Sequence, residues 1–265
     1  MPEYTINNIG THVVTQGTGP PLLLVHGFPL DHTMWSGQVD HFAASHTVIA
    51  PDLRGFGQSE VTDDPVTMQT YADDLAALLD AMGITEPVHF CGLSMGGYIA
   101  WAFVEHHRDR LASLILCDTR ATADNSAAQK TRELTAQRVL KEGPDFLASG
   151  LIDKLFVKQT REQQPEIIEQ TKEVIRSTDP RTVAAASRAM AARPDVTTRL
   201  PAIDVPTLII VGEHDAISPP SEMREIADAM PTATYVEIPN AGHMAPLERP
   251  EPVNAAIEHY LETLH

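Results

Sequence analysis

Short apolar runs alternate with helical patterns through the first half of the sequence, and this alternation limits the possible folds more than any other feature. Four runs have the length and composition of buried strands: residues 22–26, 47–51, 87–92 and 114–117. Between two of them, apolar residues from Tyr71 to Met82 recur at the spacing of a helix. Such alternation is typical of βαβ units. The sequence therefore predicts an α/β fold with a mostly parallel sheet and helices on its faces.

A change of pattern in the middle of the chain predicts an insertion. There, helical segments follow one another without a strand between them, and the strand pattern returns only near residue 206. Residues 121–195 contain 12 Lys and Arg against 11 Asp and Glu, whereas the rest of the chain contains 7 against 25. We therefore expect one core domain formed by residues 1–118 and 196–265, with a helical insertion at residues 119–195.

The overall charge argues against several classes of partner. The net charge is -17 at pH 7, and the phosphates of nucleic acids and anionic membranes require basic partners. No apolar run is long enough to cross a bilayer, and residues 1–19 lack the pattern of a signal peptide. Cys91 and Cys117 lie in apolar runs, as reduced core thiols do. We therefore expect a cytoplasmic protein that binds neither nucleic acid nor membranes; the sequence indicates no oligomeric state.

Ser94 lies in a motif that is typical of a catalytic nucleophile. Gly92-Leu93-Ser94-Met95-Gly96 matches G-x-S-x-G between an apolar strand and a helical pattern. A strand-to-helix turn this tight forces strained backbone angles on the serine, and the flanking glycines remove side chains that would collide. A glycine-rich turn required only for packing would give the same motif. In this context, however, we interpret Ser94 as a nucleophile held at the edge of the sheet.

An acid and a base follow Ser94 in the order that a catalytic triad requires. Asp215 comes after the apolar run LIIVG (208–212), and His243 comes after the run TYVEI (234–238). A serine hydroxyl needs such a base, which is itself oriented by an acid. His214 is a weaker alternative for the base, because it has no glycine-framed turn of its own. Asp118 is the more serious alternative for the acid, although we expect it to cap the start of the insertion instead.

Two backbone N–H groups are candidates for an oxyanion hole. One belongs to Met95, the residue after the nucleophile. The other belongs to Phe28, which follows the flexible Gly27 in the turn after a predicted strand. Pro29 has no N–H to donate. His26 precedes this turn, and we expect its ring to bond to the loop backbone rather than to act as a base.

Several motifs, in this order, resemble those of the α/β-hydrolases over the whole chain except the insertion: VHGFPLDHTMW, PDLRGFGQS, GLSMGG, VGEHD and AGHMAPLERP. The resemblance implies an eight-stranded, mostly parallel sheet flanked by helices, with a helical cap over the active site. It also implies that Asp52 and Arg54 form an internal ion pair. Glu248 and Arg249 are expected to anchor the turn after His243.

The resemblance also narrows the activity. Haloalkane dehalogenases and epoxide hydrolases of this family carry Asp at the nucleophile position, where this chain has Ser94. The motifs are most similar to those of small bacterial esterases, enol-lactonases and cofactor-free perhydrolases. We therefore expect a serine hydrolase that cleaves a small carboxylic ester or lactone through an acyl-enzyme on Ser94, without cofactor or metal. Trp35 and Met244 are candidates for the substrate pocket, beside Phe28 and Met95.

Other reactions remain open. The same triad could hydrolyse a carbon–carbon bond or form a peracid, and the scaffold could also serve a non-catalytic binding protein. Pro29 resembles the proline in the HGxPLD loop of perhydrolases, which favours hydrogen peroxide as the attacking partner. The same proline could equally serve only to stiffen the turn.

Overall fold

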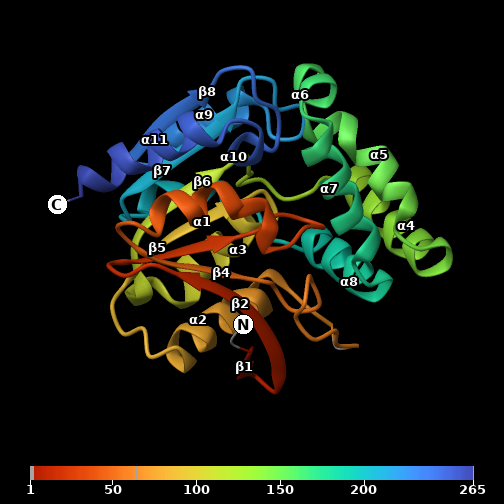
Figure 1. Ribbon diagram of the computed structural model, residues 1–265, viewed down its shortest axis with the longest axis horizontal. Coiled ribbons are helices and arrows are strands. Elements are labelled where there is room, and N and C mark those ends of the chain that lie inside the picture. Colours follow the sequence, from red (N-terminus) through yellow and green to blue (C-terminus); the bar gives the residue numbers. More distant parts are fainter. Residues whose placement is uncertain (1–2, 64, 265) are drawn as a thin grey trace.

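One sheet of eight strands forms the centre of the computed structural model, which describes residues 3–63 and 65–264 (Figure 1). The strands lie in the order β1-β2-β4-β3-β5-β6-β7-β8. β2 pairs antiparallel with β1 and β4, and all other neighbours are parallel. The predicted fold class is therefore confirmed. The strands are β1 Glu3–Ile6, β2 Ile9–Gln16, β3 Pro21–Val25, β4 Thr47–Pro51, β5 Val88–Leu93, β6 Leu111–Cys117, β7 Thr207–Gly212 and β8 Ala233–Ile238.

The central strands are mostly apolar because both faces of the sheet are covered. Along β3, Leu22 and Leu24 pack into one hydrophobic core, and Leu23 and Val25 pack into the other. This division follows from the alternation of side chains along a strand. Parallel strands covered on both faces have nearly continuous apolar sequences, which is why short apolar runs marked these strands in the sequence.

Helices cover each face of the sheet. α2 (Met68–Ala81), α3 (Met95–His106) and α9 (Pro220–Ala229) contribute to one core, and α1 (Ser36–Phe42) and α11 (Pro250–Glu262) to the other. The predicted N-cap of α2 is present, since the side chain of Thr67 accepts a hydrogen bond from the N–H of Thr70. The remaining short elements near the core are α10 (Ala245–Glu248) and the 3-10 helices η1 (His32–Trp35), η2 (Arg108–Arg110) and η3 (Thr197–Ala202).

Helices without strands fill the chain between β6 and β7, as the sequence predicts, and Figure 1 shows them gathered at one side of the sheet. They are α4 Ser126–Glu142, α5 Asp145–Leu155, α6 Lys158–Gln163, α7 Pro165–Ser177 and α8 Pro180–Ala191. Two hydrogen bonds join them to the segment after β8: the N–H of Met244 donates to the carbonyl of Leu155, and the N–H of Val157 donates to the carboxylate of Glu248 in α10. The division into a core and a cap at residues 119–195 stays a prediction.

No helix in the described part of the chain is both long and apolar enough to span a membrane.

The expected ion pair between Asp52 and Arg54 is wrong. The Arg54 guanidinium instead binds Asp74 on α2 through two bonds, Nε to Oδ2 at 2.8 Å and one terminal nitrogen to Oδ1 at 2.7 Å. Asp52 is fully buried and accepts bonds from the backbone N–H groups of His32 and Gln58, each at 2.9 Å. Its Oδ1 also lies 2.7 Å from Nδ1 of His32. Asp52 therefore connects the loop after β4 to the loop after β3.

The contact between His32 and Asp52 stabilises the charged imidazolium of His32 and the charged carboxylate of Asp52. Burial by itself would raise the pKa of Asp52, but the bonds from His32 and Gln58 outweigh burial and lower it. Burial would likewise lower the pKa of His32, but the bond to Asp52 outweighs it and raises the pKa. The charged pair therefore favours folding below the unfolded pKa of histidine and above that of aspartate.

We expect the variant His32→Asn to be less stable than the wild type by roughly 1.5–3 kcal/mol between about pH 4 and 6.5. The difference should shrink as the pH rises through the raised pKa of His32, because the neutral ring no longer contributes its charge. Urea unfolding across this pH range measures it. His41→Asn is the control, since His41 lies 3.8 Å from Glu258 and both side chains are exposed. A difference that grows above pH 7 would contradict the account.

Candidate active site

The turn between β5 and α3 holds Ser94 in a strained conformation. Ser94 has φ 52° and ψ −108°. Residues other than glycine rarely adopt these backbone angles. Its N–H donates to the carbonyl of Cys117 at 2.9 Å, and its own carbonyl accepts the hydroxyl of Thr119 at 2.7 Å. These bonds hold the turn against the end of β6.

The glycines of this turn are needed because backbone packs directly on backbone. A Cβ atom on Gly96 would lie 2.3 Å from the carbonyl oxygen of Val25, and one on Gly92 would lie 2.5 Å from the carbonyl oxygen of Gly96. Both distances are too short for a side-chain carbon. The G-x-S-x-G motif therefore reflects steric requirements that the structure meets at the position of Ser94.

Asp215 and His243 form a buried pair at the same edge of the sheet. Asp215 follows β7 and His243 follows β8, and Oδ2 of Asp215 lies 2.8 Å from Nδ1 of His243. The other carboxylate oxygen, Oδ1, accepts the N–H groups of Ile217 at 2.7 Å and Ser218 at 3.0 Å. Burial opposes ionisation of Asp215, but the imidazole and these N–H groups outweigh it and lower its pKa. The carboxylate can thus orient the imidazole and stabilise its charged form.

Ser94 does not yet bond to His243. No hydrogen bond joins the two side chains within residues 3–63 and 65–264. In ligand-free enzymes such bonds are often long and tighten only when substrate binds. The described contacts nonetheless connect Ser94 to the strand that precedes Asp215, because Ser94 bonds to Cys117 of β6 and the neighbouring Asp118 bonds to Gly212 at the end of β7.

The turn after β3 lies beside the nucleophile. A Cβ atom on Gly27 would lie 3.5 Å from Cβ of Ser94. In the described part of the chain, the N–H groups of Phe28 and Met95 have no hydrogen-bond acceptor. The two candidate oxyanion donors are therefore unoccupied by protein groups. The peptide bond between Phe28 and Pro29 is cis.

His26 has the structural role that we expected. Its Nε2 accepts the N–H of Leu53 at 3.0 Å, and its Nδ1 lies 3.0 Å from the carbonyl of Gly27. Burial lowers the pKa of His26, so the ring is neutral. Both ring nitrogens are thus occupied by loop backbone, which leaves none for proton transfer.

His214 is unsuited to serve as the base. Its side chain is 55% exposed, and its nearest charged group is Glu213, 3.8 Å away. It therefore points away from the buried pair of Asp215 and His243.

Asp118 does not cap the insertion, and that expectation is wrong. Its Oδ1 accepts the N–H of Gly212 at 2.8 Å, so the carboxyl group joins the end of β6 to the end of β7. Asp118 is fully buried and has φ 47°. Burial and the adjacent Asp215 carboxylate raise the pKa of Asp118 well above its usual value.

The two pocket candidates lie in different places. Trp35 is fully buried in the core, and its indole nitrogen has no hydrogen-bond partner within the described residues. Met244 lies at a cleft of about 540 Å³ between α7 and the loop after β3. This cleft is lined by Leu30, Asp31, Thr33, Met34, Ser36, Ile167, Gln170, Thr171, Glu173, Val174, Met244 and Leu247.

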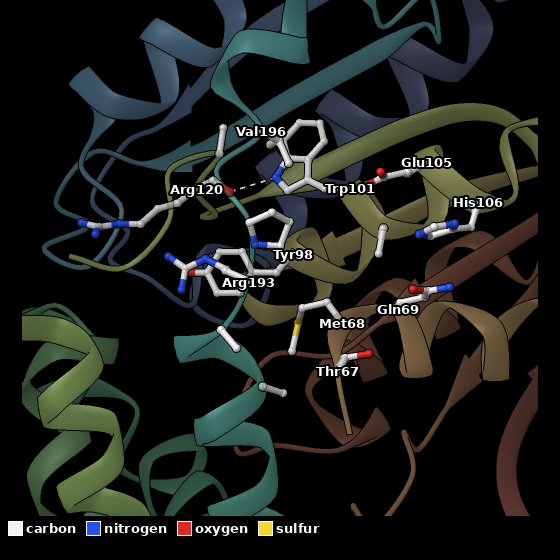
Figure 2. A pocket seen from close by; sticks show the side chains of 15 residues that line it. Thr67, Met68, Gln69, Tyr98, Trp101, Glu105, His106, Arg120, Arg193 and Val196 are labelled. Atoms are coloured by element: carbon white, nitrogen blue, oxygen red, sulfur yellow. Dashed lines mark hydrogen bonds between the residues drawn. The ribbon is translucent and has the colours of Figure 1, made fainter. Parts of the chain in front are cut away.

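A second cavity, of about 360 Å³, lies along α3 (Figure 2). Tyr98 and Trp101 on α3 line it together with the segment 192–196 that returns from α8. The indole N–H of Trp101 donates to the carbonyl of Arg120 at 2.8 Å, and the Arg193 guanidinium stacks on Tyr98. None of Ser94, Asp215 and His243 lines this cavity or the cleft beside Met244. The cleft is the better candidate for the substrate, because Met244 directly follows His243 in the chain.

Two clusters have the spacing that a metal ion could bridge: His12, His32 and Asp52, and Asp118, Asp215 and His243. In each cluster two members already bond to each other, His32 to Asp52 in the first and His243 to Asp215 in the second. Metal binding at either place would require these bonds to break.

Three residues near Ser94 were missed in the sequence. Thr119 bonds to the carbonyl of Ser94, and its position directly after an apolar run was a usable signal. Met34 accepts the N–H of Gly27 at 3.5 Å, and Thr178 donates to the carbonyl of Pro29 at 3.3 Å. Nothing in the sequence indicates the last contact, because it joins segments 149 residues apart.

Comparisons with known proteins agree with this geometry. The family model described as "alpha/beta hydrolase fold" matches residues 20–250. A solved thermophilic esterase from Thermogutta terrifontis is 48% identical, with 99% of this chain and 98% of that chain covered and a TM-score of 0.96.

Two curated relatives cover most of the chain as well. "3-oxoadipate enol-lactonase 2" of Acinetobacter baylyi is 28% identical over 92% of this chain and 89% of its own length. "Putative non-heme bromoperoxidase BpoC" of Mycobacterium tuberculosis is 31% identical over 91% of this chain and 93% of its own length.

We expect Gly96→Ala to lower the free energy of unfolding by roughly 1–3 kcal/mol, because the added methyl group must displace the backbone of β3. Gly150→Ala is the matched control, since that glycine also lies in a helix but has open space around it. The control should be neutral or more stable by up to about 1 kcal/mol. Urea unfolding of both variants measures this, and equal stabilities would show that the close approach at Gly96 is not required.

Proposed function

We propose, for a chain that belongs to the α/β-hydrolase family, that it hydrolyses a small carboxylic ester or lactone through an acyl-enzyme on Ser94. The observation that carries the proposal is the buried bond between Asp215 and His243 at the sheet edge where the strained Ser94 turn ends. A carboxylate, an imidazole and a serine in this order form the usual means of activating a hydroxyl nucleophile. The similarity to an esterase over 99% of the chain supports the same activity.

In the first half of the reaction, the Ser94 hydroxyl oxygen attacks the carbonyl carbon of the substrate. Its proton passes to Nε2 of His243, and Asp215 stabilises the resulting imidazolium through Nδ1. The carbonyl oxygen becomes negative and accepts hydrogen bonds from the N–H groups of Phe28 and Met95. When the tetrahedral intermediate collapses, the bond to the leaving oxygen breaks and that oxygen takes the proton from His243.

In the second half, water takes the place of the serine hydroxyl. His243 accepts a proton from the water as its oxygen attacks the acyl carbon of the ester on Ser94. The new intermediate collapses, Ser94 regains its proton from His243, and the carboxylic acid leaves. The enzyme returns to its starting state with one water consumed for each ester bond broken.

The cleft beside Met244 favours an uncharged substrate. It approaches the site at two places: Met34 in its lining contacts Gly27, and Met244 directly follows His243. Most of the surface that lines it is apolar, and its ionisable side chains are Asp31 and Glu173, both acidic. A substrate with a free carboxylate would meet these like charges, and the basic side chain beside them, Arg176, lies 3.8 Å from Glu173 but does not line the cleft.

This charge distribution distinguishes between the activities of the relatives. The enol-lactone of 3-oxoadipate keeps one free carboxylate, because only the other takes part in the lactone ring. The cleft suits a neutral ester better. Perhydrolysis, which the similarity to a bromoperoxidase and Pro29 suggest, and carbon–carbon cleavage use the same triad and stay alternative hypotheses.

We expect Ser94→Ala, His243→Ala and Asp215→Asn each to lower kcat by roughly a thousandfold or more, with little change in the far-ultraviolet circular dichroism. The double variant Ser94→Ala/His243→Ala should be little slower than either single variant, because the residues act as a unit. His214→Ala is the control, since its exposed side chain lies outside the pair. Initial rates with a nitrophenyl ester measure all of these. A fully active Ser94→Ala variant would overturn the proposed function.

We expect the nitrophenyl ester of butyric acid to be cleaved with a kcat/KM roughly tenfold or more above that of the mono-nitrophenyl ester of succinic acid. The two acyl groups have the same number of carbons and differ mainly in the terminal carboxylate. Glu173→Gln should narrow the gap by improving the succinyl ester more than the butyryl ester. Equal rates for the two esters would contradict the charge preference.

Rate measurements with two further substrates distinguish the alternative reactions. Loss of a diketone measures carbon–carbon cleavage, and formation of peracid from acetate and hydrogen peroxide measures perhydrolysis. Diketone cleavage or peracid formation at a higher kcat/KM than ester cleavage would replace the ester as the proposed substrate.

A further inference from the structure

The buried carboxyl group of Asp118 has one oxygen that the described contacts leave unsatisfied. Oδ1 accepts the N–H of Gly212 at 2.8 Å, but Oδ2 is buried and meets no donor among the described residues. The main chain of Asp118 is held firmly, since its N–H donates to Ile210 and its carbonyl accepts the hydroxyl of Ser218. A buried polar atom without a partner is costly and calls for an explanation.

The carboxylate of Asp215 lies close to this carboxyl group. One ligand atom from each of Asp118, Asp215 and His243 lies within 4.8 Å of the others. Two carboxylate oxygens cannot bond to each other unless one of them carries a proton. The titratable groups that face Asp118 are Asp215 from the loop after β7, His243 from the loop after β8 and Cys117 from β6.

The hydrogen bonds of Asp215 leave room for one further donor. An ionised carboxylate offers about four acceptor sites. Three are used by the N–H groups of Ile217 and Ser218 and by Nδ1 of His243. A proton on Oδ2 of Asp118 would fill the fourth site and give the unsatisfied oxygen its partner.

We propose that Asp118 is a neutral carboxylic acid that donates a hydrogen bond from Oδ2 to the carboxylate of Asp215 and so fixes its orientation toward His243. This inference rests on the proposed function, because it gives Asp118 a positioning role in the same site. Asp118 does not touch the substrate or exchange its proton during turnover.

Electrostatics favours one negative charge at this place rather than two. Burial and the Asp215 carboxylate both raise the pKa of Asp118, whereas the pKa of Asp215 is lowered by its bonds. The environments thus shift the pKa values of the two carboxyl groups in opposite directions. This pattern is found where adjacent acids have different roles. The single negative charge then lies on Asp215, where it faces the imidazole.

The direct test is infrared spectroscopy of the free protein near about pH 8, where an exposed aspartate is ionised. We expect wild type to show the carbonyl stretch of a protonated carboxyl group and Asp118→Asn to lack it. Labelling aspartate with carbon-13 at the carboxyl carbon should shift this band, which distinguishes it from a band of any protonated glutamate; burial also raises the pKa of Glu248. A spectrum in which Asp118→Asn removes no protonated aspartate band would overturn the proposal.

Kinetics provides a second readout. Asp118→Leu removes the hydrogen bond and should lower kcat by roughly tenfold or more, with a smaller change in KM. Asp118→Asn can still accept from Gly212 and donate to Asp215, so it should recover most of the lost kcat. The neutral acid and the amide carry the same charge. When kcat/KM is measured against pH, the midpoint of its fall at acid pH (the acid limb) should therefore be the same in Asp118→Asn as in the wild type.

Two kinetic outcomes would contradict the proposal. If Asp118 were ionised, Asp118→Asn would remove a negative charge near the imidazole, and the acid limb would move to lower pH. If Asp118→Asn were as slow as Asp215→Asn, Asp118 would be the anionic acid of the triad. If Asp118→Leu does not fold, the infrared comparison of the wild type with Asp118→Asn still decides whether Asp118 is protonated. That result needs no turnover, so it is independent of the loss of Ser94 activity that tests the proposed function.

Discussion

The close approach of backbone to backbone at the start of α3 is the constraint on which the site depends. Gly96 packs against the carbonyl oxygen of Val25 at the end of β3, where any side chain would collide. This contact brings the turn after β3 beside Ser94 and leaves two N–H groups without protein acceptors. The strained angles of Ser94 persist because surrounding bonds, including those to Cys117 and Thr119, hold the turn in place.

The sequence predicted the architecture well because the signals were local. Buried parallel strands such as β3 and β5 appear as short apolar runs, and their carboxyl ends meet at one edge of the sheet. The residues that follow β5, β7 and β8 could therefore be expected to lie near one another. The pairing of Asp215 with His243 agrees with that expectation. The catalytic roles of these residues stay predictions.

Contacts between distant segments could not be predicted. The family resemblance implied an ion pair between Arg54 and Asp52, yet Arg54 binds Asp74 on α2. Asp118 looked like a cap for the insertion, but the chain folds so that its carboxyl group faces Gly212, 94 residues away. In both cases the choice of partner depends on how helices and loops pack on the sheet, which no local pattern encodes.

Trapping of the acyl-enzyme tests the central claim most directly. The protein would be mixed with an uncharged nitrophenyl ester, quenched with acid within one turnover, digested and analysed by mass spectrometry. The account predicts one added acyl mass on the peptide that contains Ser94, and none on the Ser94→Ala protein. Rapid ester hydrolysis with the acyl group on another residue, or with Ser94→Ala equally active, would contradict it.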